Sequence, residues 1–203
     1  TGEVLRRFRT VDTPRGLYVT PDGAGLFVAG FDNGELQVFD LATGDGEVIY
    51  RNGRSLRHIV GDAGGDRIYV SDLTRDHVLV VDPAAAVVDV LAAVDRKPNT
   101  IALIPDCPVL LVSCRGRNNP ETYYLPGPQW GSIVVLDAHS GEYLDAIVGG
   151  NQPTGLAVSP DGSLLATSDF LDDRVTIYAV PAYEVLAAGG GGRWESHRAD
   201  LEK

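Results

Sequence analysis

The sequence lacks the features that mark membrane-spanning, disulfide-stabilised or haem-attaching proteins. No apolar run approaches the roughly 20 residues that a helix needs to cross a bilayer. Cysteine is scarce: Cys107 and Cys114 lie at opposite ends of one expected strand, about 20 Å apart, whereas a disulfide needs Cα atoms within about 7 Å. We therefore expect that these two thiols do not bond to each other. Their spacing also excludes the CxxC redox motif and the CxxCH haem-attachment motif.

Basic residues are also few. The chain has 17 Lys and Arg against 28 Asp and Glu, which gives a formal net charge of −11. Nucleic acids are bound through a basic stripe that neutralises their phosphates, and no such stripe is visible in the sequence. The composition therefore argues against nucleic acid as a partner.

No motif for a metal, a cofactor or catalysis is present. The four histidines are scattered through the chain and no HExxH pattern occurs, so we predict no metal site, no cofactor and no catalytic residue. Recurring aspartates such as Asp72 and Asp172 are interpreted as solvated turn residues rather than calcium ligands. His58 lies at the start of an expected inner strand, where a hydrogen-bonded channel residue is favoured over a ligand or a general base.

What the sequence does contain is a repeat, and its clearest copy is Gln152–Val180. This copy has three short apolar runs separated by turn signals, which is typical of an antiparallel meander. Between its first two runs stands a Pro-Asp-Gly turn, in which Pro presets φ and Gly allows positive φ. Related copies begin at four positions separated by 42, 42 and 55 residues: Pro14, Leu56, Pro98 and Pro153. A spacing conserved at several positions at once indicates a structural repeat.

One loop of the repeat is enlarged. The second strands end at Ala29, Ser71, Ser113 and Ser168, which keep the spacing of 42, 42 and 55. The 13 extra residues of the third copy therefore lie after Ser113 and before the next strand begins at Ile133.

A period of about 42 residues with four strands per unit predicts an all-β propeller of four-stranded antiparallel blades. We expect full blades over 14–50, 55–94, 98–148 and 153–188, whose fourth strands are Val48–Tyr50, Val87–Ala92, Tyr143–Val148 and Val185–Ala188. Residues 1–11 align with fourth strands, so they are predicted to be the outer strand of an incomplete blade. Residues 189–203 are predicted to be a Gly-rich linker and a polar C-terminal tail, in which Trp194 could dock on the propeller or on a partner.

The blade sequences PTGLAVSPDGSLLATSDFLDDRVTIYAV and PRGLYVTPDGAGLFVAGFDNGELQVFDLATG resemble the YVTN-type blade of surface-layer-like and YncE-like bacterial propellers. The resemblance covers residues 1 to about 188 and implies the fold more specifically than the function. Family members include adhesins, periplasmic binding proteins and redox-enzyme subunits. The resemblance implies a periplasmic or extracellular location. The second copy departs from the pattern at Gly61–Asp66, which replaces the Pro-Asp-Gly turn.

Four blades and one extra strand suggest part of a larger propeller of about seven blades. Two alternatives remain open: the N-terminal strand closes a four-bladed ring, or a second chain or a second copy supplies further blades. An open propeller exposes the flat apolar face of a terminal blade, so we expect another protein chain or missing blades as a partner.

The enlarged loop, residues 114–132, is the strongest candidate for a binding site. Loops of this kind in compact domains are often functional, and this one is rich in side chains that form directional hydrogen bonds or large contacts. It should lie on one rim with the links between blades, where it could hold a protein or a small ligand. The predicted site residues are Arg115, Arg117, Asn118, Asn119, Tyr123, Tyr124 and Trp130 of the loop, with Arg57, His58, Asn151 and Gln152 nearby. The alternative is that Tyr123, Tyr124 and Trp130 merely cover the blade edge.

Two function classes follow. The first is a binding or assembly scaffold that performs no chemistry, and the absence of any catalytic or cofactor motif favours it. The second, which the family resemblance permits, is the propeller part of an exported redox enzyme whose cofactor is held elsewhere. A lactonase-type hydrolase is a more distant third.

Overall fold

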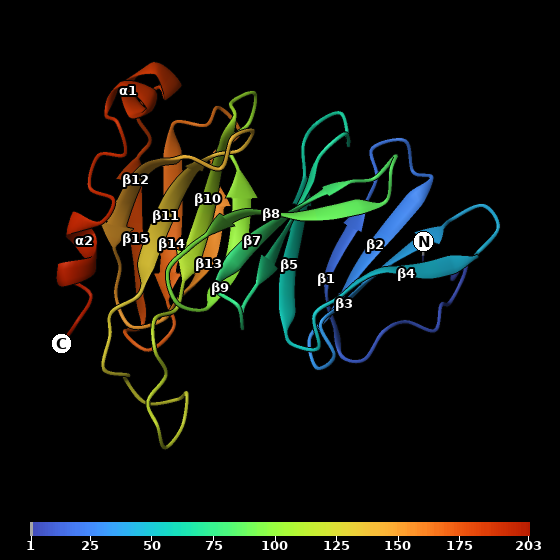
Figure 1. Ribbon diagram of the computed structural model, residues 1–203, viewed down its shortest axis with the longest axis horizontal. Coiled ribbons are helices and arrows are strands. Elements are labelled where there is room, and N and C mark those ends of the chain that lie inside the picture. Colours follow the sequence, from blue (N-terminus) through green and yellow to red (C-terminus); the bar gives the residue numbers. More distant parts are fainter. Residues whose placement is uncertain (1) are drawn as a thin grey trace.

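The computed structural model describes residues 2–203, which form four antiparallel sheets that follow one another in an arc (Figure 1). The first two sheets contain β1 (Pro14–Val19), β2 (Gly25–Gly30), β3 (Glu35–Asp40), β4 (Gly46–Arg51), β5 (Leu56–Gly61), β6 (Ile68–Asp72), β7 (His77–Asp82) and β8 (Val87–Ala93). The other two contain β9 (Pro98–Leu103), β10 (Val109–Cys114), β11 (Ser132–Asp137), β12 (Tyr143–Val148), β13 (Pro153–Val158), β14 (Leu164–Asp169) and β15 (Arg174–Ala179). This architecture confirms the predicted all-β fold of propeller blades.

The turns between first and second strands form as their sequences predict. In the Pro160-Asp161-Gly162 turn, Gly162 has φ +72° and the Asp161 carboxylate accepts a hydrogen bond from the backbone N–H of Ser163 at 3.1 Å. Residues 61–66 also form a hairpin turn, since Asp62 N donates to Arg67 O at 3.0 Å. The Asp side chain and the glycine together let the chain reverse within a few residues.

Alternation along each strand assigns its side chains to the two faces of a blade. In β2, Phe27 and Ala29 pack into the core between the first and second blades, whereas Leu26 and Val28 face the opposite side. Two more cores fill the spaces between the second and third blades and between the third and fourth. The inner strands β1, β5, β9 and β13 pack side by side in this order, so their N-terminal ends meet on one rim.

The N-terminal segment differs from the prediction, because no strand forms over residues 2–11. Instead, the segment packs on the face of the first blade that no other blade covers. Phe8 contacts Phe39 at a ring-centroid distance of 4.7 Å, and Val11 is buried against Val28. The Gln37 side chain accepts the hydrogen bond of the Val11 N–H at 3.1 Å, which takes the place of a strand partner.

The last blade has three strands, and the expected strand Val185–Ala188 is wrong: this segment lies in helix α1 (Tyr183–Ala188). Its Glu, Leu and Ala residues favour helix, and Leu186 is buried in the core between the third and fourth blades. β15 therefore remains an edge strand, on which Val175 and Ile177 are each 66% exposed.

The C-terminal segment also differs from the expected polar tail. It contains helix α2 (Ser196–Ala199) and lies against β12, beside α1 (Figure 1). The Trp194 ring stacks on Tyr143 with centroids 3.6 Å apart, and His197 is buried. Cys107 and Cys114 are both free, and no helix within residues 2–203 is long and apolar enough to cross a membrane.

Candidate functional site

A cavity of about 610 Å³ lies where the inner strands of all four blades begin. Its wall includes parts of the loop 114–132, which projects from the sheets in Figure 1. The lining residues are Arg15, Phe31, Arg54, Ser55, Arg57, Leu73, Thr74, Lys97, Arg115, Asn118, Tyr123, Thr154 and Phe170.

The repeat explains why these side chains converge. Arg15, Arg57 and Thr154 are the second residues of three inner strands and occupy equivalent positions of the 42-residue repeat. A second equivalent set follows the second strand of each blade: Phe31, Leu73, Arg115 and Phe170. Because blades are arranged around one axis, equivalent positions are brought to the same opening.

The cavity is strongly basic. Five of its lining residues are Lys or Arg, and none is Asp or Glu. Among residues 2–203, no ion pair involves any of these five side chains. Burial lowers the pKa of Arg57 and of Arg115, and the nearby charge of Arg15 lowers both further. The cavity therefore gathers like charges that repel one another.

Aromatic rings hold the guanidinium groups. The Arg15 and Arg57 guanidinium carbons lie 4.3 Å and 5.6 Å from the centre of the Phe31 ring. The guanidinium carbon of Arg115 lies 5.7 Å from the centre of the Tyr123 ring. A cation that faces a ring is attracted by the ring's quadrupole, so these contacts position the arginines without neutralising them.

Gln152 fixes the wall between the third and fourth blades. It is 2% exposed and has φ +58°, a conformation in which few residues other than glycine are found. Its side-chain oxygen accepts a hydrogen bond from Arg115, and its Nε2 donates to the carbonyl of Tyr123 at 2.7 Å. Gln152 thus holds both Arg115 and the loop, although it does not line the cavity itself.

Two buried side-chain atoms of residues that line the cavity have no hydrogen-bond partner within residues 2–203. They are Nε of Arg115, which is a donor, and Oδ1 of Asn118, which is an acceptor. Buried polar groups are nearly always hydrogen-bonded in proteins. Arg115 and Asn118 therefore reach the cavity wall with part of their hydrogen-bonding capacity unused.

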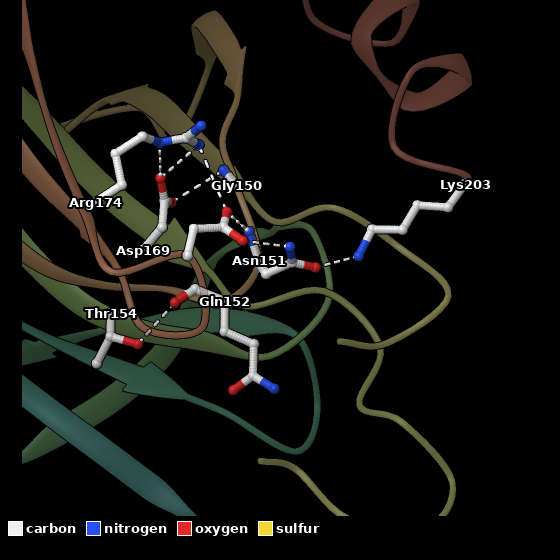
Figure 2. Close-up of polar contacts among 8 residues, drawn as sticks. Gly150, Asn151, Gln152, Thr154, Asp169, Arg174 and Lys203 are labelled. Atoms are coloured by element: carbon white, nitrogen blue, oxygen red, sulfur yellow. Dashed lines mark hydrogen bonds and ion pairs between the residues drawn. The ribbon is translucent and has the colours of Figure 1, made fainter. Parts of the chain in front are cut away.

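Asn151 belongs to a structural network, shown in Figure 2, rather than to the cavity. The backbone N–H of Asn151 donates a hydrogen bond to the Asp172 carboxylate at 2.7 Å, and its side-chain Nδ2 donates to the same carboxylate at 2.5 Å. The side-chain Oδ1 of Asn151 accepts a hydrogen bond from Lys203. Burial would raise the pKa of Asp172, but these hydrogen bonds and the charge of Arg174 lower it overall. In Figure 2 the Gln152 side chain points away from this network.

Three of the predicted loop residues form contacts with other residues of the same chain. Arg117 pairs with Glu202 at 2.7 Å, and the Trp130 ring lies under Lys203, whose ammonium nitrogen is 4.1 Å from the ring centre. Asn119 donates to Pro126 O at 3.0 Å and closes the loop on itself. The contacts of Arg117 and Trp130 tie the loop 114–132 to the C-terminal segment.

The remaining predicted residues are His58 and Tyr124. The His58 Nδ1 accepts a hydrogen bond from Ile101 N at 3.4 Å, and burial lowers the pKa of its ring. The Tyr124 ring packs against the Tyr123 ring at an interplanar angle of 33°, and its centre lies 6.1 Å from that of Phe170, so it supports the edge of the cavity. The structure thus places four predicted residues on the cavity wall: Arg57, Arg115, Asn118 and Tyr123.

Five residues of this wall that carry its charge and aromatic character were not among the predicted site residues: Arg15, Phe31, Arg54, Lys97 and Phe170. Arg54 and Lys97 belong to the links between blades, which were expected on the same rim as the loop. The repeat itself could have identified the other three, because Arg15 is equivalent to Arg57, and Phe31 and Phe170 are equivalent to Arg115. No cluster of three or more His, Cys, Asp or Glu suited to a metal ion occurs within residues 2–203.

The comparisons with known proteins support the fold. No family model matches the chain. Antigen Lp49 of Leptospira interrogans is 37% identical over 185 residues, which are 86% of this chain and 40% of that protein. The chain thus spans well under half the length of this curated relative.

Among solved structures, the chain is similar to Kuenenia stuttgartiensis hydrazine synthase, with a TM-score of 0.64 and 20% identity over 76% of this chain and 43% of that one. It is also similar to a chain of the mitotic checkpoint complex, with a TM-score of 0.65 and 17% identity over 88% of this chain and 54% of that one. Both are propeller-like, so the likeness shows the fold and leaves function to the site.

Proposed function

We propose that this protein is a binding scaffold whose ligand occupies the cavity at the start of the inner strands. The observation that carries the proposal is that all four blades contribute side chains to one cavity. The cavity wall is also held firmly, because Gln152 and the C-terminal segment fix the loop 114–132. A rigid concave site with a few convergent polar groups is the usual form of a ligand-binding site.

Assembly with another protein chain is part of the same proposal. β15 has no strand beyond it within the described residues, and it exposes Val175 and Ile177 at the sheet edge. Such an edge can pair with an added strand. The likeness to a chain of the mitotic checkpoint complex is consistent with this role. Native mass spectrometry of the purified protein would detect the expected second polypeptide, and a lone 21.6 kDa species would argue against it.

A second candidate function is the propeller part of an exported redox enzyme, with the cofactor held by another domain or subunit. The likeness to hydrazine synthase favours it. The YVTN-type family and a periplasmic or extracellular location remain part of the proposal, and both rest on the blade sequences. A metal or chromophore in the natively purified complex would favour the enzyme over the scaffold.

The cavity itself is tested by filling it. Thr154 lies on the cavity wall, and we expect the substitution Thr154→Trp to occlude the space. The matched control is Ala84→Trp, which places the same side chain on an exposed turn between β7 and β8, at the opposite rim. The measurement is a thermal-shift screen of a panel of neutral, cationic and anionic small molecules.

We expect at least one compound to raise the melting temperature of the wild type and of the Ala84→Trp control but not that of the Thr154→Trp variant. Circular dichroism establishes beforehand that both variants are folded. If every stabilising compound acts equally on all three proteins, the cavity is not the binding site.

A further inference from the structure

The charge of the cavity is opposite to that of the protein. The chain carries 28 acidic and 17 basic side chains, yet five basic and no acidic side chains line this one space. Concentrating like charges in a partly buried site costs free energy, because the charges repel one another and lose contact with water. The site therefore has an electrostatic preference for a negatively charged ligand.

The basic side chains are available for such a ligand. Elsewhere in the described chain, arginines such as Arg51, Arg174 and Arg193 form ion pairs with Asp or Glu. The five cavity side chains form none, and no hydrogen bond from the side chain of Arg15 or Arg57 is found within residues 2–203. The guanidinium carbons of Arg15 and Arg57 lie over the Phe31 ring, 4.3 Å and 5.6 Å from its centre. A ring accepts no conventional hydrogen bond in its plane, so the N–H groups of these arginines remain available for carboxylate or phosphate oxygens.

Two further lining side chains refine the ligand class. The Arg115 guanidinium group can donate hydrogen bonds to an anionic oxygen, while the Asn118 side-chain amide can accept one from a hydroxyl group. The aromatic rings of Phe31, Tyr123 and Phe170 add apolar surface to the same wall. A small organic molecule that carries several anionic groups and a hydroxyl matches this set better than an isolated inorganic ion does.

We propose that the cavity binds a small organic polyanion, in which at least two carboxylate or phosphate groups contact Arg15, Arg57 and Arg115. This inference rests on the proposed function, because it specifies the chemical class of the ligand for the same cavity. Carboxylate and phosphate oxygens share the geometry that a guanidinium group recognises, so the experiment compares both.

The test is isothermal titration calorimetry of the 203-residue chain with citrate, a hydroxylated tricarboxylate, and in parallel with fructose 1,6-bisphosphate, a hydroxylated organic bisphosphate. The key variant is Arg57→Gln. The control is Arg51→Gln, which removes the same charge from β4, where Arg51 pairs with Glu35 away from the cavity. Because hydrogen bonds between charged groups are strong and short-ranged, the Arg57 variant should bind at least about tenfold more weakly than the wild type. The control should bind within about twofold of the wild type, since long-range charge effects are screened by salt.

A second variant, Arg15→Gln, keeps the test decisive if Arg57→Gln does not fold, because Arg15 is exposed and its loss leaves no buried gap. It should also weaken binding, and binding of the wild type should weaken as salt is added. Citrate binding alone assigns carboxylates as the ligand groups, whereas preferential binding of fructose 1,6-bisphosphate assigns phosphates.

Failure of this inference differs from failure of the proposed function. If a neutral compound stabilises the wild type but not the Thr154→Trp variant while neither anion binds, the cavity is a binding site of another class. If both arginine variants bind the anions as tightly as the wild type, the anions bind elsewhere and the inference is wrong. If no compound of any charge distinguishes Thr154→Trp from the wild type, both proposals are wrong.

Discussion

The docking of the C-terminal segment includes a buried polar contact between His197 and Asp95. His197 is 3% exposed, and its Nε2 lies 2.6 Å from Oδ2 of Asp95. The same carboxylate oxygen accepts a hydrogen bond from Ser132 at 2.6 Å. The substitution His197→Ala removes one of the groups that satisfy this buried carboxylate, and it leaves space beside the Trp194 ring, whose centre is 5.1 Å from that of His197.

The cost of that substitution can be worked from these contacts. A hydrogen bond to a charged group contributes about 1.5–3 kcal/mol, and an unsatisfied buried group adds a penalty. We expect docking to weaken by about 2 kcal/mol, which corresponds to roughly a 30-fold change in the docking equilibrium.

Hydrogen exchange at the Trp130 amide measures this change directly, because Trp130 N donates to the carbonyl of Leu201 at 2.8 Å only while the segment is docked. Exchange at this amide should accelerate by roughly 30-fold in His197→Ala. The control His139→Ala alters an exposed turn and should leave the exchange rate unchanged. If exchange at Trp130 is the same in His197→Ala as in the wild type, the buried contact does not hold the segment and the reasoning is refuted.

Two further predictions concern stability. Burial raises the pKa of Asp145, but the hydrogen bonds from Arg193 outweigh burial and lower the pKa below its ordinary value. The contact between Asp145 and Arg193 therefore stabilises the fold fully above the ordinary Asp pKa. This stabilisation is lost as the pH falls through the lower pKa of the folded state. Urea unfolding between pH 7 and pH 3 should therefore show a loss of stability below about pH 4 that is smaller in Asp145→Asn, and identical profiles would contradict this. Leu186→Ala should lower the free energy of unfolding, measured in urea, by about 2–4 kcal/mol, because the Leu186 side chain is 6% exposed and lies in the core. Val185→Ala, on the exposed face of α1, should change the free energy of unfolding by less than about 0.5 kcal/mol. Equal effects of the two substitutions would mean that α1 does not pack as described.

Most of the strands could be predicted because their signals are local. Each Pro-Asp-Gly turn and each apolar run acts within a few residues. The spacing of 42, 42 and 55 residues between the first strands, from Pro14 to Pro153, repeats these signals in register. The exceptions are segments in which tertiary packing prevails. Residues 185–188 occupy a fourth-strand position in the repeat but join a helix that buries Leu186.

The site was less predictable, because its residues meet only through the arrangement of the blades. Arg115 and Gln152 are far apart in sequence, and no local pattern pairs them. Trp130 is of a residue type that is common in binding sites, yet its ring lies under Lys203 of the same chain. Arg15, in contrast, could have been placed beside Arg57 by carrying the repeat spacing from one inner strand to the next.

The most direct test of the central claim is a crystal structure of the protein grown with citrate. The account predicts electron density for citrate in the cavity shared by the four blades, with carboxylate oxygens within hydrogen-bond distance of at least two of Arg15, Arg57 and Arg115. A cavity that holds only water at a saturating citrate concentration would contradict it, as would citrate bound only on the outer surface.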